Sequence, residues 1–527
     1  MSLVDESARF TYSGHKPVPS PCGKYIAYLN GSKLVIRKSD LLTLDRLIKI
    51  KTKNSNGFLR ISQITWEPLY NGQSNKVALL IDNENTVKIY DMNDEKVDIS
   101  IIEDDVFGIE KFQWLPKGEE SIETAYDGSK QIVVFTKNEL YAKIYSLDYS
   151  QVLISIEKPK FNKVLIKPNS NIFSIITSKI NGYVVRNYLN NGSSVAHFNN
   201  IDIDSVLNLT DSINWSPNGQ WLLCNDSVIG ETKVSVYSLF NEVLSQSEAI
   251  FRYEDVSDPL GAIDVKWGEG NEHVLISDHH EQIHCLDVYT GLNIQYTLQH
   301  KPQTETSKIW KQDNINWKYV RKQTSYKFPQ IGNLPLHLSG VTKFLVNGNY
   351  TFVTVKSMPG VVFIWDVNGE DSNEPKEVLV TNTRIKDMIV ANENKDLLLV
   401  VNEDSITLWH TEWSSPIVIP WEDDEGSSLK GACFINATRG SARIMLWTSN
   451  LFEVVQIKLS STSEFEGMDS EQIDVIRNGS PALIDDLTHV VELANGVQQS
   501  EWGHNNTNTI QLDDTFMSKK QHKSIRK

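Results

Sequence analysis

A single unit recurs along most of the 527-residue chain and constrains its fold more than any other feature. Each copy has a short apolar strand, a turn rich in Pro, Asn and Gly, an apolar run, a polar turn and a strand ending near an aromatic residue. The clearest copy spans residues 212–224 and continues at 233–239. Nine copies align on Pro19, Trp66, Trp114, Ile166, Trp215, Trp267, Leu345, Ile389 and Phe434. Successive alignment positions lie 47, 48, 52, 49, 52, 78, 44 and 45 residues apart, a near-constant period that indicates a repeat array.

A period of about 40–50 residues with four short strands is typical of the blades of a WD-type β-propeller. Apolar and polar residues alternate within the units, which predicts strands buried on one face. We therefore predict an all-β fold, with about nine degenerate four-stranded blades in residues 8–459, closed as a single large ring or as two rings. Separate β-sandwiches would show no fixed period. Residues 10–13 are a candidate extra strand that closes the last blade.

The Trp-Asp signature of such repeats survives only at Trp365 and Asp366. The upstream Gly-His pair is not recognisable, so we expect the buried Asp–His–hydroxyl–Trp relay to be mostly absent. Cohesion between blades must then depend on apolar packing.

The one irregular spacing, 78 residues, marks an insertion that we predict to be a long loop at residues 301–340. It carries Trp310, Trp317, Tyr319 and Arg321 among several lysines. Large aromatic and Arg side chains are common hot spots of protein interfaces, so these four are the candidate partner-binding residues. The aromatic residues could instead brace the loop against the ring, or stack on nucleic acid bases.

Residues 460–527 contain few apolar residues, and we expect a largely disordered tail. One stretch, residues 481–497, could form a short helix. Ser480 precedes Pro481 at its start and is a candidate phosphorylation site.

Composition narrows the possible functions. The chain has 51 Lys and Arg against 67 Asp and Glu, a net charge of −16, which argues against nucleic acid as the main partner. No apolar stretch is long enough to span a membrane, so no membrane association is expected. Motifs for a nucleophile, a phosphate-binding loop or a zinc site are absent, which predicts a protein that is not an enzyme and needs no cofactor or metal. The polar cluster at residues 278–281 is interpreted as a solvated turn between two strands.

Nine degenerate units, an insertion after the sixth and an intact Trp-Asp pair only in the seventh form a specific combination. Together they resemble the WD-repeat protein eight family, the centrosome and spindle-pole WD-repeat proteins of animals and fungi. The resemblance covers roughly residues 8–459. The stretches that carry it are residues 20–28, 34–37, 213–219, 340–367 and 405–410.

This resemblance implies an adaptor that binds a coiled-coil anchoring protein and a minus-end-directed kinesin, and so anchors microtubule minus ends. Contact with microtubules would be indirect. The implied location is the cytoplasm and cytoskeleton, at the spindle pole body or microtubule organising centre. Two alternatives stay open: a nine-bladed propeller of translation initiation that binds tRNA, mRNA or the ribosome, and a general protein-interaction scaffold.

Overall fold

The computed structural model divides the chain into two compact units, Met1–Met468 and Asp469–Lys527. It describes residues 4–459, except 53–58, 70–71, 93–98, 117–130, 149–150, 181, 193, 204–212, 229–230, 240–250, 256–259, 314, 333, 368–373 and 422–425. The tail predictions, including the helix at residues 481–497 and the site at Ser480, lie outside the described residues.

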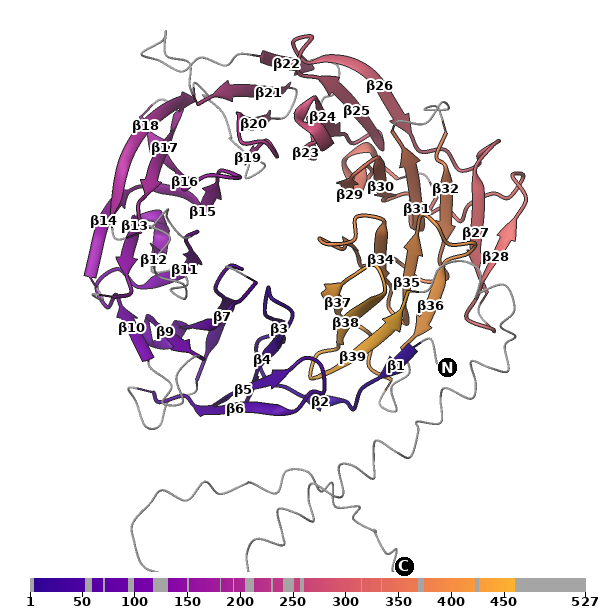
Figure 1. The fold of residues 1–527 in the computed structure, drawn as a ribbon. Coiled ribbons are helices and arrows are strands. Elements are labelled where there is room, and N and C mark those ends of the chain that lie inside the picture. Colours follow the sequence, from indigo (N-terminus) through magenta and orange to yellow (C-terminus); the bar gives the residue numbers. More distant parts are fainter. Residues whose placement is uncertain are drawn as a thin grey trace, which may run out of the picture. The chain divides into compact units, whose positions relative to one another are not determined.

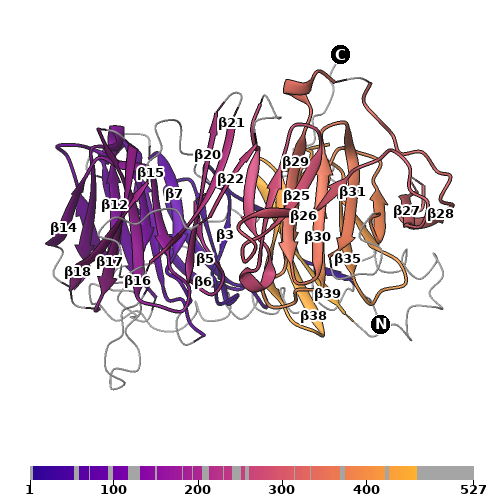
Figure 2. The same cartoon turned by 90° about the horizontal axis from the view of Figure 1, so that it is seen from above.

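In the described part of the chain, 39 strands form nine antiparallel-dominated sheets that follow one another around a ring (Figure 1). Each sheet is one blade, and successive strands run from the centre of the ring outward, except that the outermost strands of blades 7 and 9 come from segments that precede the rest of the blade. Figure 2 shows the same blades from the side. Of the two closures left open by the sequence, one continuous ring is observed.

The first five blades have four strands each. Blade 1 is β3 (Val18–Pro19), β4 (Tyr25–Asn30), β5 (Lys33–Lys38) and β6 (Leu44–Lys49). Blade 2 is β7 (Ile61–Trp66), β8 (Lys76–Ile81), β9 (Thr86–Asp91) and β10 (Ile99–Glu103). Blade 3 is β11 (Ile109–Trp114), β12 (Gln131–Thr136), β13 (Tyr141–Ser146) and β14 (Gln151–Glu157). Blade 4 is β15 (Pro159–Ile166), β16 (Ile172–Lys179), β17 (Gly182–Asn190) and β18 (Val195–Ile203). Blade 5 is β19 (Asn214–Trp215), β20 (Trp221–Val228), β21 (Glu231–Ser238) and β22 (Phe251–Asp255).

The remaining blades include the two that depart from four strands. Blade 6 is β23 (Asp264–Trp267), β24 (His273–Ser277), β25 (Gln282–Asp287) and β26 (Asn293–Gln299). Blade 7 is β29 (Val341–Asn347), β30 (Tyr350–Val355), β31 (Met358–Asp366) and β32 (Glu377–Val380), extended by β27 (Lys308–Gln312) and β28 (Tyr319–Lys322). Blade 8 is β33 (Asp387–Val390), β34 (Leu397–Val401), β35 (Ser405–His410) and β36 (Ile417–Pro420). Blade 9 is β37 (Gly431–Ala437), β38 (Ser441–Trp447) and β39 (Leu451–Lys458), completed by β1 (Val4–Glu6) and β2 (Phe10–Thr11).

The N-terminus closes the ring. Phe10 of β2 pairs with Phe452 of β39, as the sequence predicted for residues 10–13. Strand β1, which begins before the predicted domain start at residue 8, continues the pairing from Val4 opposite Ile457. Joining β1 and β2 to β39 in one sheet ties the first and last blades together without any covalent link.

The nine alignment residues all lie in the first strand of a blade, from Pro19 in β3 to Phe434 in β37. Each copy of the sequence unit therefore corresponds to one blade, and the prediction of a nine-bladed propeller is confirmed. Seven sheets have four strands, blade 9 reaches four positions because β1 and β2 both pair with β39, and blade 7 has two strands more than the predicted four.

The core lies between blades, with one apolar cluster at each of the nine junctions. Strand β8 shows why: Val77 and Leu79 face blade 1, while Ala78 and Leu80 face blade 3, and all four are fully buried. The expectation of strands buried on one face is therefore wrong for such middle strands. They are apolar on both faces because each blade is covered by a neighbour on either side.

Helical structure in the described residues is limited to four short 3-10 turns. They are η1 (Asp82–Glu84), η2 (Lys137–Glu139), η3 (Glu269–Asn271) and η4 (Leu336–Leu338). Over the same part of the chain, no helix has the length and apolar character needed to cross a bilayer.

Candidate protein-interaction site

The inserted segment does not form the long loop that we predicted for residues 301–340. It folds into a hairpin, β27–β28, on the outer edge of blade 7 (Figures 1 and 2). Strand β27 runs parallel to β32, with Ile309 opposite Val378 and Trp310 opposite Leu379. A sheet edge exposes unpaired backbone groups, and an apolar segment that reaches it gains hydrogen bonds and packing together. The segments that lead into β27 and β32 are also held together, because Glu374 accepts the Thr306 N–H at 2.7 Å.

One buried carboxylate joins the hairpin to two blades. Glu377 of β32 accepts the indole N–H of Trp310 at 3.0 Å and that of Trp409 at 2.9 Å, both on Oε2. Its other oxygen lies 3.5 Å from the Lys308 ammonium. The contact links β27 to β32 of blade 7 and to β35 of blade 8. A buried carboxylate is stable only when such donors surround it, so Glu377 and its partners act as one unit.

The side chain of Tyr319, in β28, points inward to the junction between blades 7 and 8. Its ring packs in the core between blades 7 and 8, and its hydroxyl lies 3.2 Å from Thr407 Oγ1. Burial raises the pKa of Tyr319 well above its usual value. Gln312, opposite Tyr319 in the hairpin, accepts the Asn382 N–H at 3.2 Å. These contacts make the hairpin a rigid extension of blade 7.

The four candidate residues thus separate into two groups. Trp310 and Tyr319 contact blades 7 and 8, whereas Arg321 is exposed on β28. Trp317 is half-buried in the hairpin turn, at a positive φ of 49°. The bracing alternative fits the positions of Trp310 and Tyr319. Arg321 and part of Trp317 remain available to a partner.

The exposed side of the hairpin is basic. Arg321 and Lys322 are exposed on β28 beside exposed Val320, and half-buried Lys318 lies immediately before the strand. Burial lowers the pKa of the nearby Lys311, and the charge of Lys322 lowers it further. The sequence places these cations among the candidate residues of the insertion, and the structure shows Arg321 and Lys322 exposed next to each other on its outer strand.

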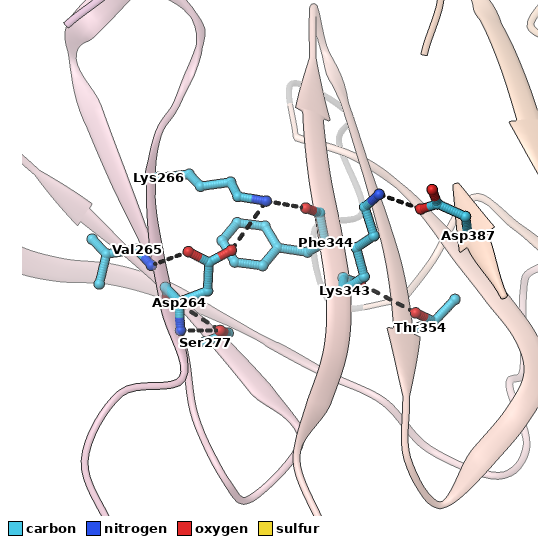
Figure 3. A network of polar contacts seen from close by, with 8 residues as sticks. All are labelled: Asp264, Val265, Lys266, Ser277, Lys343, Phe344, Thr354 and Asp387. Carbon is cyan, nitrogen blue, oxygen red and sulfur yellow. Dashed lines mark hydrogen bonds and ion pairs between the residues drawn. The ribbon is translucent and has the colours of Figure 1, made fainter. Parts of the chain in front are cut away.

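The blades that carry the hairpin are held together near the centre of the ring (Figure 3). Lys266 of blade 6 donates to the Phe344 carbonyl of blade 7 at 2.6 Å and lies 3.1 Å from the Asp264 carboxylate. Lys343 of blade 7 pairs in turn with Asp387 of blade 8. The first strand of each blade is an edge strand, so Lys266 supplies a partner for a backbone carbonyl that no neighbouring strand covers, whereas Lys343 links two side chains.

Two glutamines make the same kind of link by a reciprocal amide contact. Gln63 donates to the Phe112 carbonyl at 2.8 Å and accepts the Phe112 N–H at 3.2 Å. Gln113 repeats the arrangement with Val164 of the next blade, at 3.2 and 3.0 Å. Sequence reasoning missed these residues. The available signal was a glutamine within three positions of the aligned tryptophan in two consecutive units.

Part of the expected Trp-Asp relay is present after all. Trp365 of β31 donates its indole N–H to His300 Nε2 at 3.2 Å. An indole can only donate, so His300 carries its proton on Nδ1, which lies 2.6 Å from the Glu281 carbonyl. Burial lowers the pKa of His300 to about 4. His300 was not singled out because it follows Gln299 and not the usual glycine.

The cluster at residues 278–281 lies in the turn between β24 and β25, as interpreted, but it is not fully solvated. Asp278 is buried, accepts the Gln282 N–H at 2.7 Å and lies 3.1 Å from His284 Nε2. The carboxylate is satisfied by its own turn and strand. Across the described residues, no group of three His, Cys, Asp or Glu side chains is arranged to hold a metal ion.

By its sheet order, the protein is a nine-bladed β-propeller of the WD type with a hairpin added to blade 7. No protein-family model matches the chain, and no curated protein matches its sequence.

Solved propeller structures resemble this chain in fold. Sqt1 from Chaetomium thermophilum has a TM-score of 0.45 at 11% identity, covering 76% of this chain and 96% of that chain. The C-terminal WD40 domain of Sif2 has a TM-score of 0.44 at 9% identity, covering 80% and 99%. A eukaryotic initiation factor has a TM-score of 0.47 at 10% identity, covering 77% and 88%. Such distant likenesses carry no argument about function.

Proposed function

We propose that the protein is a non-enzymatic adaptor of the spindle pole. In this role it binds a coiled-coil anchoring protein and a minus-end-directed kinesin, and thereby anchors microtubule minus ends. The support is the combination in the sequence that resembles the spindle-pole WD-repeat proteins: nine units, an insertion after the sixth and the Trp-Asp pair in the seventh.

One structural observation favours an adaptor over an enzyme. The added element is rigidly fixed by inward contacts of Trp310 and Tyr319, yet it presents charged side chains outward from the rim. A ring with two faces, a rim and a fixed projection can hold several partners at defined positions. The buried ionisable groups described above are each satisfied by structural partners, as expected of a scaffold.

Affinity purification of the tagged full chain, followed by mass spectrometry, tests the proposal together with imaging of the tagged protein in dividing cells. We expect a coiled-coil protein and a kinesin to be recovered, and the tag to lie at the spindle pole. Recovery of initiation factors with ribosomal subunits would instead support the translation alternative. Recovery of other complexes, without pole localisation, would support a general scaffold.

A further inference from the structure

The outermost strand of blade 7 has a free edge. Within the described residues, β28 pairs along its length only with β27. Just before β28, Lys318 forms an isolated backbone bridge with Ile417 of blade 8. That bridge shows that the outer edge of the hairpin can pair with another backbone at one end. Beyond it, Tyr319–Lys322 have no second neighbouring strand.

The charge around this edge is opposite to that of the whole protein. Residues 301–340 contain seven Lys and Arg against two carboxylates, a net charge of +5 in a chain of −16. Lys308 is matched by Glu377. Among the described residues, no carboxylate pairs with Lys318, Arg321 or Lys322. Charges are screened over about 8–10 Å at physiological salt, so this patch acts on a partner locally despite the acidic remainder.

We propose that β28 is a docking edge for an extended acidic segment of a protein partner, which adds to blade 7 as a further strand. Backbone hydrogen bonds would give the segment its alignment, and its Asp or Glu side chains would meet Arg321 and Lys322. Val320 and Lys322 lie on one face of the strand and Arg321 on the other, so alternate side chains of the partner meet different surfaces. This inference does not depend on where in the cell the protein acts.

Nucleic acid is the less favoured occupant for two structural reasons. Two of the three aromatic residues that could stack on bases have structural partners: Trp310 donates to Glu377 and Tyr319 is buried beside Thr407. A strand edge also pairs specifically with a polypeptide backbone. Basic residues on an edge strand have another known use, which is to prevent edge-to-edge aggregation. The experiment must separate these three roles.

The test uses the full-length protein and a fluorescein-labelled 12-residue peptide of alternating Glu and Thr, followed by fluorescence anisotropy. The variant is Arg321→Glu with Lys322→Glu. The control is Lys24→Glu with Lys38→Glu, which reverses two exposed cations on blade 1. We expect the hairpin variant to weaken binding by about tenfold or more and the control to change it little. Methylation of alternate backbone nitrogens of the peptide should weaken binding by a similar factor, because it removes pairing donors.

Three results would overturn the proposal. Equal binding of the methylated and unmethylated peptides would exclude strand addition. Tighter binding of a 12-nucleotide single-stranded RNA, lost in the hairpin variant, would assign the patch to nucleic acid. Peptide binding that is absent or unchanged in the variant, with new self-association in sedimentation, would show that the cations only protect the edge.

Discussion

The indole N–H of Trp310 donates to Glu377 Oε2 at 3.0 Å, across the junction between the inserted hairpin and blade 7. The same oxygen accepts Trp409 of blade 8, so one carboxylate fixes an insertion and two blades. An insertion held in this way becomes part of the ring. Its outward side chains are then presented at fixed positions, which is what a binding surface needs to keep the entropy cost of association low.

The first prediction concerns this carboxylate. Glu377→Ala should lower the free energy of unfolding by about 2–4 kcal/mol, because it leaves the Trp409 and Trp310 N–H groups without an acceptor. Glu377→Gln retains an oxygen and should recover part of the loss. Urea unfolding measures both, with Glu412→Ala at an exposed position as the control. Equal stability of Glu377→Ala and the control would show that the carboxylate contributes nothing.

The second prediction separates bracing from binding in the hairpin. Trp310→Ala should destabilise the protein by about 3 kcal/mol or more, as expected for removing a large packed ring, and leave partner recovery per folded molecule unchanged. Trp317→Ala, at a half-buried position, should cost less stability. Thermal melting measures the stability of each variant, and quantified affinity purification measures how much partner it recovers. A loss of about 2 kcal/mol or more in partner-binding free energy, at an unchanged melting temperature, would instead show that Trp310 contacts the partner as a hot-spot residue.

The third prediction concerns pH. His300 has a pKa of about 4 in the folded protein, against roughly 6.5 in an unfolded chain. The unfolded state therefore binds more protons between these values, so this contribution to stability is complete above about pH 6.5 and is lost as pH falls toward 4. The loss should reach about 2 kcal/mol, less than the full shift implies because the ring is partly exposed.

Urea unfolding from pH 7.5 to 4.5 measures that loss. His300→Gln should flatten the pH dependence relative to the unsubstituted protein, while His337→Gln, at an exposed position, should not. Parallel pH profiles for the unsubstituted protein and His300→Gln would contradict the assignment of this proton.

The fourth prediction concerns the links between first strands. Gln63→Ala should remove the side-chain hydrogen bonds to the N–H and the carbonyl of Phe112, and lower the free energy of unfolding by about 1–2 kcal/mol. Hydrogen exchange followed by mass spectrometry should show faster exchange around Phe112, with peptides from blades 6–8 unaffected. Gln220→Ala, at an exposed turn, serves as the control. Unchanged exchange in β11 would mean that water replaces the glutamine without loss.

Much of the fold follows from local pattern. The near-constant spacing of the nine aligned residues located every first strand, because each blade must repeat the same strand and turn lengths to close a ring. The closing strand at Phe10 and Thr11 was also foreseeable, since the last unit has one strand too few. Strand β27 was not, because its pairing with β32 joins segments about 70 residues apart and has no local signal.

The sequence alone determined the number of blades, their order and the position of the insertion, because these depend on a periodic pattern that is read along the chain. Only the tertiary structure decided what the insertion does. The side-chain partners of Trp310, Tyr319 and His300 lie on strands of other sequence regions, and they come within hydrogen-bond distance only when the hairpin and the neighbouring blades pack together. Burial of Tyr319, partial burial of Trp310 and exposure of Arg321 therefore could not be assigned from residue type. These environments are set by the pairing of the hairpin with the outer strand of blade 7, next to blade 8.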